Sequence, residues 1–380
     1  MKICVVGLRG IPGIMGGIEK HCEQIYPRIA ALDNDTRIVV TGRSPYLERH
    51  PHDVGKVHVV SLWALHNKYL ETILHTLLAT FYARFIARAG IIHIHAIGPG
   101  LAAPLARALG MKVLVTHHGA DYQRAKWNKL AKWVLRLGER WSIAASHATV
   151  IVCASLCREL KQRYPQHAKK LLYIPNGTEP HQNVPVTPGR HPILRSFGLH
   201  PRSYVLSVGR LVPEKGFQDL VAAFGRLYTH RKLVIAGDAD HPDDFSRWLR
   251  QQEGSNILFT GFQTGQDLAA LYANAALFVL PSYHEGLPIA ALEALGFGCP
   301  VLLSNIGPNL DIGLPPQCYF PAGDVSALFR KLNVADYGCY QADTRTILAR
   351  FNWDMVARKT LSLYWKLPRL AKHQPLEDAP

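Results

Sequence analysis

Short apolar runs alternate with longer amphipathic segments along almost the whole chain, and this alternation limits the fold more than any other feature. Apolar runs of about four to eight residues bounded by turn signals are typical of buried strands, and the segments between them have helical periodicity. Strands are predicted at 2–7, 36–41, 57–62, 91–95, 112–116, 148–153, 171–174, 204–208, 232–236, 256–260, 276–280 and 300–303. The alternation predicts doubly wound α/β domains, which bind ligands at the carboxyl ends of their strands.

At 380 residues the chain is long enough for two domains with separate cores. The segment 180–201 holds five prolines and no apolar periodicity, so it reads as a connection. We therefore predict an N-terminal domain over 1–180, a linker over 181–199 and a C-terminal domain over 200–350. A last amphipathic helix is predicted from about 352, within the terminal segment 352–380.

The composition, with 48% hydrophobic and 19% charged residues, is that of an ordinary globular protein. The chain opens directly on a strand, without a secretory signal pattern. Its seven cysteines have no paired spacing, which favours a reducing compartment and predicts a cytoplasmic protein. An apolar stretch within 69–89 is shorter than the ~20 residues of a membrane span and is interrupted by His75 and Arg84, so a packed helix is expected.

The positive charge is concentrated in the N-terminal half of the chain. The net charge is +15, and residues 1–185 hold 24 Lys and Arg against 11 Asp and Glu. This surplus predicts an anionic partner for that domain, such as a membrane surface or a lipid diphosphate. Nucleic acid is not expected, because no nucleic-acid-binding signature is present.

A helix over 124–141 carries part of this charge. Its two faces are predicted as an apolar core face (Trp127, Leu130, Ala131, Val134, Leu137, Gly138 and Trp141) and a basic face (Lys129, Lys132, Arg136 and Arg140). The basic face is either solvated or in contact with anionic lipid headgroups. In the second case the cytoplasmic protein would bind the membrane peripherally through this face.

Two glutamates lie eight positions apart across a predicted strand-to-helix turn. Glu285 follows the strand 276–280, and Glu293 lies in the next helix, for which Pro288 suits the first position. Between them, Gly286 permits a tight turn, and its N–H and that of Leu287 are available at the helix start. Two carboxylates beside such N–H groups fit a ligand that has many hydroxyls and an anion, as a nucleotide sugar does.

A pair of cations follows the strand 204–208. Arg210 and Lys215 lie on the loop after that strand, and two fixed cations there would neutralise a diphosphate. The combination with Glu285 and Glu293 makes this a strong indication of a nucleotide-sugar site.

At these positions the chain resembles the retaining nucleotide-sugar glycosyltransferases of family 4. The matching features are Gly16-Gly17, His118 in Thr116-His117-His118-Gly119, Pro175-Asn176-Gly177, Gly209-Arg210, Glu214-Lys215-Gly216, Gly261 and Glu285-x7-Glu293. The resemblance implies the GT-B fold, in which two Rossmann-like doubly wound domains face a cleft. It also implies that the C-terminal helix, about 352–380, crosses back to the N-terminal, acceptor-binding domain, while the C-terminal domain binds the donor. The segment 10–19 and the block 118–127 resemble a subgroup that includes bacterial rhamnosyltransferases of surface-polysaccharide assembly, such as lipopolysaccharide and exopolysaccharide synthesis.

The resemblance also implies roles for individual residues. Catalytic contributions are expected from Glu285, His118, Arg210 and Lys215; donor binding also from Gly16, Gly17, Gly286, Leu287 and Glu293; and acceptor contacts from Glu19, His95 and Asp121. The implied reaction transfers a hexosyl or deoxyhexosyl group, rhamnose included, from a nucleoside-diphosphate sugar to a glycan hydroxyl. The implied acceptor is a glycan on a polyprenyl diphosphate. No cofactor and no metal are expected, although Asp238-x-Asp240 matches a metal-binding pattern of other glycosyltransferases.

Two alternatives remain open at this point. One is a catalytically silent lipid- or glycan-binding module on the same scaffold, and the other is a nucleotide-sugar epimerase. A dehydrogenase is disfavoured because the glycines at 7, 10 and 13 lack the Gly-x-Gly-x2-Gly spacing of a dinucleotide site.

Overall fold

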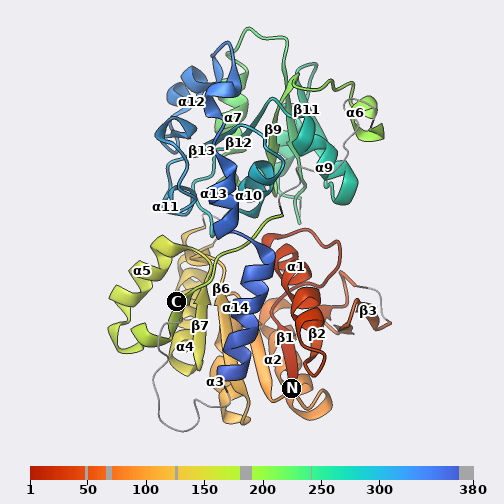
Figure 1. Ribbon diagram of the computed structural model, residues 1–380, viewed down its shortest axis with the longest axis vertical. Coiled ribbons are helices and arrows are strands. Elements are labelled where there is room, and N and C mark those ends of the chain that lie inside the picture. The colour runs from red at the N-terminus through yellow and green to blue at the C-terminus, as the bar shows by residue number, and fades with distance from the viewer. Residues whose placement is uncertain (48–49, 66–70, 125–126, 180–190, 241, 368–380) are drawn as a thin grey trace. The chain divides into compact units, whose positions relative to one another are not determined.

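The alternating strands and helices build two separate sheets in the computed structural model, which describes residues 1–47, 50–65, 71–124, 127–179, 191–240 and 242–367. The chain divides into two units (Figure 1). Unit 1 comprises Met1–Asn176 together with the segment that begins at Trp353, and unit 2 comprises Gly177–Asn352. Each unit has its own buried apolar core.

Unit 1 contains an eight-stranded sheet. Its strands are β1 (Lys2–Val6), β2 (Arg37–Arg43), β3 (His52–Val54), β4 (Val57–Leu62), β5 (Ile91–His95), β6 (Lys112–His117), β7 (Ala148–Ile151) and β8 (Leu171–Tyr173). Their spatial order is β3-β4-β2-β1-β5-β6-β7-β8, and only the β3–β4 pair is antiparallel. The strand order reverses between β1 and β5, the position at which open α/β sheets bind ligands.

The helices of unit 1 follow the strands in alternation. They are α1 (Gly17–Leu32), α2 (Glu71–Phe81) with the π-helical turn η1 (Tyr82–Ile86), η2 (Pro99–Ala102), α3 (Ala103–Ala108), η3 (Asp121–Gln123), α4 (Lys129–Ala145), α5 (Ala154–Arg163), η4 (Pro165–Lys170) and α14 (Trp353–Lys366). The last of these, α14, packs against α1 (Figure 1). An ion pair joins the two helices, with Arg28 Nε 3.1 Å from Asp354 Oδ1. The C-terminal helix is therefore an integral part of unit 1.

Unit 2 contains a six-stranded, all-parallel sheet. Its strands are β9 (Tyr204–Val208), β10 (Lys232–Ala236), β11 (Ile257–Gly261), β12 (Leu277–Leu280), β13 (Val301–Ser304) and β14 (Tyr319–Phe320). Their order is β11-β10-β9-β12-β13-β14, so the order reverses between β9 and β12. Both sheets have the doubly wound arrangement, and the predicted fold class is confirmed.

The helices of unit 2 surround that sheet. They are α6 (Pro192–Ser196), η5 (Pro213–Lys215), α7 (Phe217–Phe224), α8 (Asp244–Arg250), α9 (Gly265–Asn274), α10 (Ile289–Gly296), α11 (Gly307–Leu310), η6 (Pro316–Cys318), α12 (Val325–Leu332), η7 (Tyr337–Tyr340) and α13 (Thr344–Arg350). Part of the predicted linker 181–199 belongs to this unit, because α6 packs on α9 and buries Leu194. Residues 181–190 of that linker lie outside the described residues.

One sequence prediction about helices needs correction, and another is confirmed. The apolar face of α4 was expected in the core, but Leu130 is 69% exposed and Trp141 is 42% exposed. The buried face instead contains Gly138, Glu139 and Ser142, because Gly138 closely approaches the Ile97 carbonyl group and Glu139 binds polar partners inside the unit. The prediction of a packed helix within 69–89 is confirmed from Glu71 onward, because α2 has a buried face, although it also exposes much of its apolar surface. Among the described residues, no helix is long and apolar enough to span a bilayer.

Candidate functional site

The loops after β9 and β12 bring a lysine and a glutamate together where the strand order of unit 2 reverses. Lys215 Nζ lies 2.6 Å from Glu285 Oε1, although the two residues are 70 positions apart in the chain. Ser282 Oγ donates a hydrogen bond to the same carboxylate oxygen at 2.6 Å. Two of the predicted catalytic residues therefore meet at one point.

The Lys215–Glu285 pair is mostly withdrawn from solvent, with exposed side-chain fractions of 17% and 9%. Burial by itself raises the pKa of the Glu285 carboxyl group. The Lys215 ammonium and the hydrogen bonds from Lys215 and Ser282 outweigh burial, so the pKa of Glu285 lies below its ordinary value. Glu285 is consequently a carboxylate at neutral pH and can accept hydrogen bonds from hydroxyl groups.

Close backbone approaches hold these loops in place. Gly216 has a φ of 69°, and a Cβ atom on it would lie 2.1 Å from the Pro281 carbonyl oxygen. A Cβ atom on Gly237 would lie 1.9 Å from the carbonyl oxygen of Gly209. Only glycine fits at either position, and the loops after β9, β10 and β12 can therefore pack against one another.

Arg210, the second predicted cation, lies on the same loop as Lys215. Its Nη1 forms an ion pair with Asp240 Oδ2 at 2.9 Å, and Arg250 pairs with Asp238 at 2.7 Å. Both carboxylates of the Asp-x-Asp pattern are thus engaged by arginine side chains. This arrangement gives that pattern a role in holding Arg210 at the carboxyl end of the sheet.

Glu293 lies on α10, which begins at Ile289, one residue after the predicted start, so that Pro288 is the N-cap. The Tyr272 hydroxyl donates a hydrogen bond to Glu293 Oε2 at 3.2 Å, so the carboxylate has a fixed neighbour. Gly286 and Leu287 lie between Glu285 and this helix, as the sequence predicts. Neither Ser282 nor Tyr272 was identified from the sequence, because serine and tyrosine at these positions match no spacing rule.

In unit 1 the predicted glycines lie on the loop that leads from β1 into α1. Gly16 has a φ of 146°, and a Cβ atom there would lie 2.1 Å from Glu19 Oε2. Glu19 is buried and accepts hydrogen bonds from the backbone N–H of Arg9 at 3.1 Å and from Arg9 Nε at 3.3 Å. Arg9 also donates to the Met15 carbonyl oxygen at 2.8 Å. Glu19 was predicted to contact the acceptor. In the structure its carboxylate binds Arg9 instead, and this contact supports the loop that contains Gly16 and Gly17.

His118 follows β6 directly and is the outermost member of a hydrogen-bonded chain of side chains. Its Nε2 lies 2.8 Å from His95 Nδ1, and His95 Nε2 lies 2.5 Å from the Tyr26 hydroxyl. The chain continues from Tyr26 to His93 Nδ1 at 2.8 Å, and His93 also contacts the Tyr364 hydroxyl of α14 at 2.6 Å. Predicted residues His118 and His95 are thus direct partners, while Tyr26, His93 and Tyr364 were not foreseen.

Burial keeps this group of histidines neutral. It lowers the pKa of His21 to about 4, although a hydrogen bond with Asn176 acts in the opposite direction. Burial also holds the pKa values of His93, His95 and His118 well below the ordinary value, and neighbouring histidines lower them further. A neutral imidazole offers one donor and one acceptor, which suits hydroxyl groups better than phosphate oxygens.

Three of these histidines also have the spacing of a possible metal site. One nitrogen each from His21, His95 and His118 lies within 4.8 Å of the others. In the structure these rings bind neighbouring side chains, since His21 Nδ1 lies 2.9 Å from Asn176 Oδ1 and His95 binds His118. The absence of a metal requirement stays a prediction.

The remaining predicted residue, Asp121, lies on η3 and pairs with Arg124 at 2.6 Å. The neighbouring His117 joins a different network, with Nε2 3.1 Å from the buried Glu139 carboxylate, which also binds Arg163. His117 and Asp121 therefore belong to two separate sets of polar contacts. Residues 125 and 126 of the block 118–127 lie outside the described residues.

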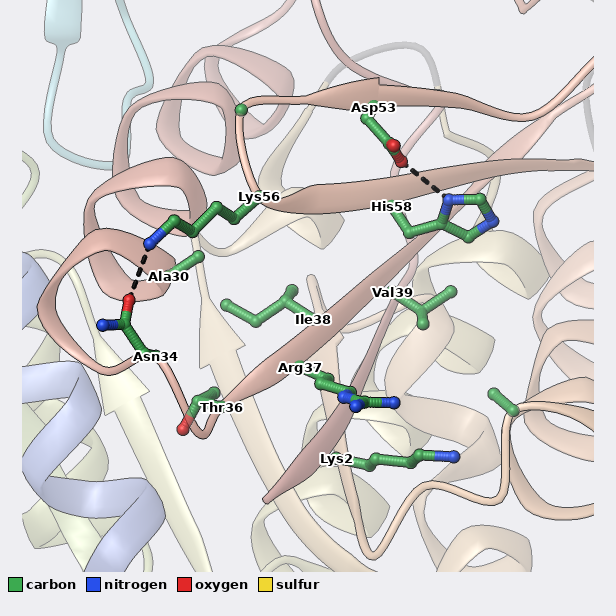
Figure 2. Close-up of a pocket in the computed structure, with 12 residues that line it drawn as sticks. Lys2, Ala30, Asn34, Thr36, Arg37, Ile38, Val39, Asp53, Lys56 and His58 are labelled. Carbon is green, nitrogen blue, oxygen red and sulfur yellow. Dashed lines mark hydrogen bonds and ion pairs between the residues drawn. The ribbon is translucent and has the colours of Figure 1, made fainter.

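A pocket on unit 1, shown in Figure 2, has none of these residues in its lining. It lies at the amino ends of the strands and is lined by Lys2 of β1, Arg37 of β2 and Lys56. Its polar groups pair with each other, since Asp53 binds His58 at 2.8 Å and Lys56 binds Asn34 at 2.6 Å. Because doubly wound sheets bind ligands at the opposite edge, we do not assign it the main function.

Comparisons with known proteins agree with this geometry. Residues 15–182 match the family model "Glycosyltransferase Family 4", and residues 194–332 match "Glycosyl transferases group 1". An uncharacterized glycosyltransferase from Methanocaldococcus jannaschii is 24% identical over 96% of this chain and 98% of its own length. The glycogen synthase of Mycobacterium tuberculosis is 25% identical over 100% of this chain and 98% of its own length.

Solved structures share the fold of the whole chain. Sucrose-phosphate synthase from Thermosynechococcus elongatus has a TM-score of 0.80, with 21% identity over 97% of this chain and 99% of that one. HepE from Anabaena, in complex with UDP and glucose, has a TM-score of 0.74, with 15% identity over 96% of this chain and 100% of that one. These likenesses show the GT-B architecture, with two parallel-sheet Rossmann-like domains.

Proposed function

We propose, on the premise that this chain is a glycosyltransferase of family 4 that uses a nucleotide sugar, that it transfers a hexosyl or deoxyhexosyl group with retention of anomeric configuration. The donor is a nucleoside-diphosphate sugar, and the acceptor is a hydroxyl group of a growing glycan. The observation that carries the proposal is the Lys215–Glu285 pair with Ser282, at the carboxyl ends of β9 and β12.

The donor diphosphate would bind at Lys215 and Arg210. Lys215 has three N–H donors and gives one to Glu285, so a phosphate oxygen can take another without breaking the pair. Arg210 is held at the same sheet edge by Asp240 and offers further N–H groups. The backbone N–H groups of Gly286 and Leu287 would add hydrogen bonds to the charge that develops on the leaving diphosphate.

The sugar and ribose would bind to the carboxylates. Ionised Glu285 would accept hydrogen bonds from the sugar hydroxyls and orient the ring, and Glu293 would hold the ribose hydroxyls. Neutral His118, fixed by His95, would donate to or accept from a further sugar hydroxyl. The Gly16-Gly17 loop would admit the phosphate and the acceptor closely, because it has no side chains there.

The chemical step we favour is attack on the same face as the leaving group. The bond between the sugar C1 and the phosphate oxygen breaks, the acceptor oxygen bonds to C1, and the acceptor proton passes to the departing phosphate oxygen. No side chain of the protein needs to form a covalent intermediate in this scheme. The positive groups around the diphosphate lower the barrier by stabilising its growing negative charge.

Several finer points belong to the same proposal. The Anabaena protein of the same fold binds UDP and glucose, which supports UDP as the first nucleotide to test. The rhamnosyltransferase-like motifs support a deoxyhexose donor and an acceptor of surface-polysaccharide assembly, linked to a polyprenyl diphosphate. We place the enzyme in the cytoplasm, at the inner face of the cytoplasmic membrane. The basic N-terminal half and the seven free thiols support that location.

Nucleotide binding tests the donor site directly. Calorimetry with UDP, GDP, dTDP and ADP should show one nucleotide binding well, and Lys215→Ala should weaken it about tenfold or more, since a charge-assisted hydrogen bond is lost. Lys232→Ala is the matched control, because Lys232 begins β10 at the opposite edge of the sheet. If none of the four nucleotides binds, the donor-site proposal is wrong.

Removal of divalent metal should leave the enzyme active. We expect the rate of sugar transfer in excess EDTA to stay within about twofold of the untreated rate, because Lys215 and Arg210 supply the positive charge that a metal otherwise provides. The measurement is the initial rate of nucleotide release with and without chelator, followed by readdition of Mg²⁺ or Mn²⁺. A rate that collapses in EDTA and recovers with metal would contradict this prediction.

A further inference from the structure

Helix α2 of unit 1 presents its large apolar side chains to solvent and its polar side chains to the interior. The exposed residues are Leu74, Leu77, Leu78 and Phe81 on α2, followed by Phe85 and Ile86 on η1. From Leu74 to Phe85 their spacing is i, i+3, i+4, i+7 and i+11, which forms one stripe along the helix. The buried residues of the helix are Glu71, His75, Thr76, Ala79 and Thr80.

The orientation of α2 is fixed by polar contacts of its buried face. Glu71 forms an ion pair with Arg43 of β2 at 2.8 Å, and both side chains are at most 10% exposed. His75 Nε2 lies 3.1 Å from the Gly42 carbonyl oxygen. Rotating the helix to bury its apolar stripe would break these buried contacts and leave Arg43 and the Gly42 carbonyl group without their partners. The loss of buried polar contacts would destabilise the unit. The polar contacts of the buried face therefore keep the apolar stripe on the surface of the folded unit.

The stripe is broad and ordered. Phe81 is 45% exposed, Phe85 is 61% exposed and Ile86 is 69% exposed. The rings of Phe81 and Phe85 stack on each other, with centroids 6.3 Å apart. Single exposed apolar residues are ordinary, but a continuous exposed stripe marks a surface that binds a partner.

Helix α4 adds a second group of exposed apolar residues. Leu130 is 69% exposed and Trp133 is 60% exposed, and α4 and α2 both pack against η2. Tryptophan is enriched where a protein meets the boundary between water and lipid, because its ring is apolar and its N–H is polar. The two helices together therefore present leucine, phenylalanine and tryptophan side chains to solvent.

Basic residues accompany both helices. Arg84 and Arg88 are exposed next to Phe85, and Arg136 and Arg140 are exposed on α4. They belong to the half of the chain that holds 24 Lys and Arg against 11 Asp and Glu. A second copy of the same surface would bring like charges together, whereas anionic lipid headgroups would neutralise them.

We propose that α2, η1 and the exposed side of α4 form a docking surface for an anionic lipid bilayer. The apolar stripe would enter the boundary between headgroups and acyl chains, while the arginines bind headgroup phosphates. This inference rests on the proposed function and deepens it, because docking would hold unit 1 beside a lipid-linked acceptor. It also names the surface, which the basic composition alone did not locate.

The test is flotation of the full-length protein with vesicles. Wild type should bind vesicles of phosphatidylethanolamine with phosphatidylglycerol, bind pure phosphatidylcholine more weakly, and lose affinity as salt is added. The double variant Phe81→Ser, Phe85→Ser should bind at least about tenfold more weakly, since two apolar anchors are lost. The control Trp248→Ser, Phe262→Ser changes two residues of unit 2 with similar exposures, 43% and 42%, and should bind as wild type does.

Nucleotide binding measured on the same preparations separates this inference from the proposed function. If wild type binds nucleotide but does not bind anionic vesicles, the docking inference is wrong and the proposed function is unaffected. Equal flotation of wild type and the Phe81, Phe85 variant would also overturn it. Conversion of a dimer to a monomer by that variant, with vesicle binding unchanged, would assign the stripe to a second copy and overturn the lipid assignment.

Discussion

Replacing Lys215 with alanine should lower the kcat of glycosyl transfer by roughly 10²–10³, the loss seen when one preorganised donor to a developing anion is removed. Lys215 lies 2.6 Å from Glu285 and is only 17% exposed, so its charge acts in a site partly withdrawn from water. Water that enters the space left by the side chain cannot replace a fixed ammonium group. The measurement is nucleotide release at saturating donor and acceptor.

The same substitution should change the pH dependence of the reaction. In wild type the pKa of Glu285 lies below its ordinary value, because Lys215 and Ser282 together outweigh burial. Without the ammonium group the effect of burial prevails, so the pKa of Glu285 should rise. If ionised Glu285 is required, the acid limb of the kcat profile should move to higher pH in Lys215→Ala. A purely structural role for Lys215 would not produce this shift.

Two further variants make the rate prediction specific. Glu285→Gln keeps the shape of the side chain but removes its charge, and we expect a large loss of kcat; near wild-type kcat would show that our role for Glu285 is wrong. Lys232→Ala removes a lysine that donates to the Phe197 and Gly198 carbonyl oxygens at the other edge of the same sheet. It should retain kcat within about twofold, which separates loss of a donor-site charge from loss of a lysine elsewhere in unit 2.

The sequence was sufficient for the strands and for bringing Lys215 and Glu285 into one candidate site. Each predicted strand has an observed counterpart, because a strand buried on both faces requires an almost continuous apolar run. The strands that were not predicted, β3 and β14, have three and two residues and lie at the ends of their sheets. Lys215 and Glu285 could be assigned to one site in advance because the carboxyl ends of parallel strands share one edge of the sheet, whereas their direct contact was not predicted.

The burial of α2 and α4 could not be read from periodicity in the same way. Helical spacing shows that a helix has two different faces, but it does not show which face is buried. In α2 the buried face is polar because Arg43, 28 positions earlier in the chain, provides the partner for Glu71. In α4 the buried face contains Glu139, whose partners His117 and Arg163 come from other elements. Such contacts between distant segments are visible only once the fold is known.

Acidification from pH 7 to about pH 4.5 should remove most of the stability of unit 1. Burial is the main cause of a lowered pKa in seven of its histidines: His21, His75 and His147, each to about 4, His93, His95 and His118, well below the ordinary value, and His167. In the unfolded chain these groups would titrate near 6.5. Between these values the unfolded state binds protons that the folded state does not, so stability is full above about pH 6.5 and falls as the pH decreases.

The expected loss of stability follows from the number of protons that the unfolded state binds and the folded state does not. Each proton of difference changes the free energy of unfolding by about 1.4 kcal/mol per pH unit, and a domain typically has only about 5–15 kcal/mol in total. Denaturant titrations at successive pH values would measure the slope. Tryptophan fluorescence suits them, because six of the seven tryptophans belong to unit 1 by residue number and only Trp248 belongs to unit 2.

A matched pair of variants would identify the source of that slope. His93→Gln keeps a group that can hydrogen-bond to Thr116 and the tyrosines but cannot take up a proton, so the slope should decrease by about one proton. His58→Gln is the control, because it removes a histidine whose side chain is 50% exposed instead of buried. A wild-type stability that is flat between pH 6.5 and 4.5 would contradict the prediction. The burial that makes unit 1 acid-sensitive also keeps the His118 imidazole neutral. A steep dependence of stability on pH would therefore support the proposal that His118 binds a sugar hydroxyl as an uncharged ring.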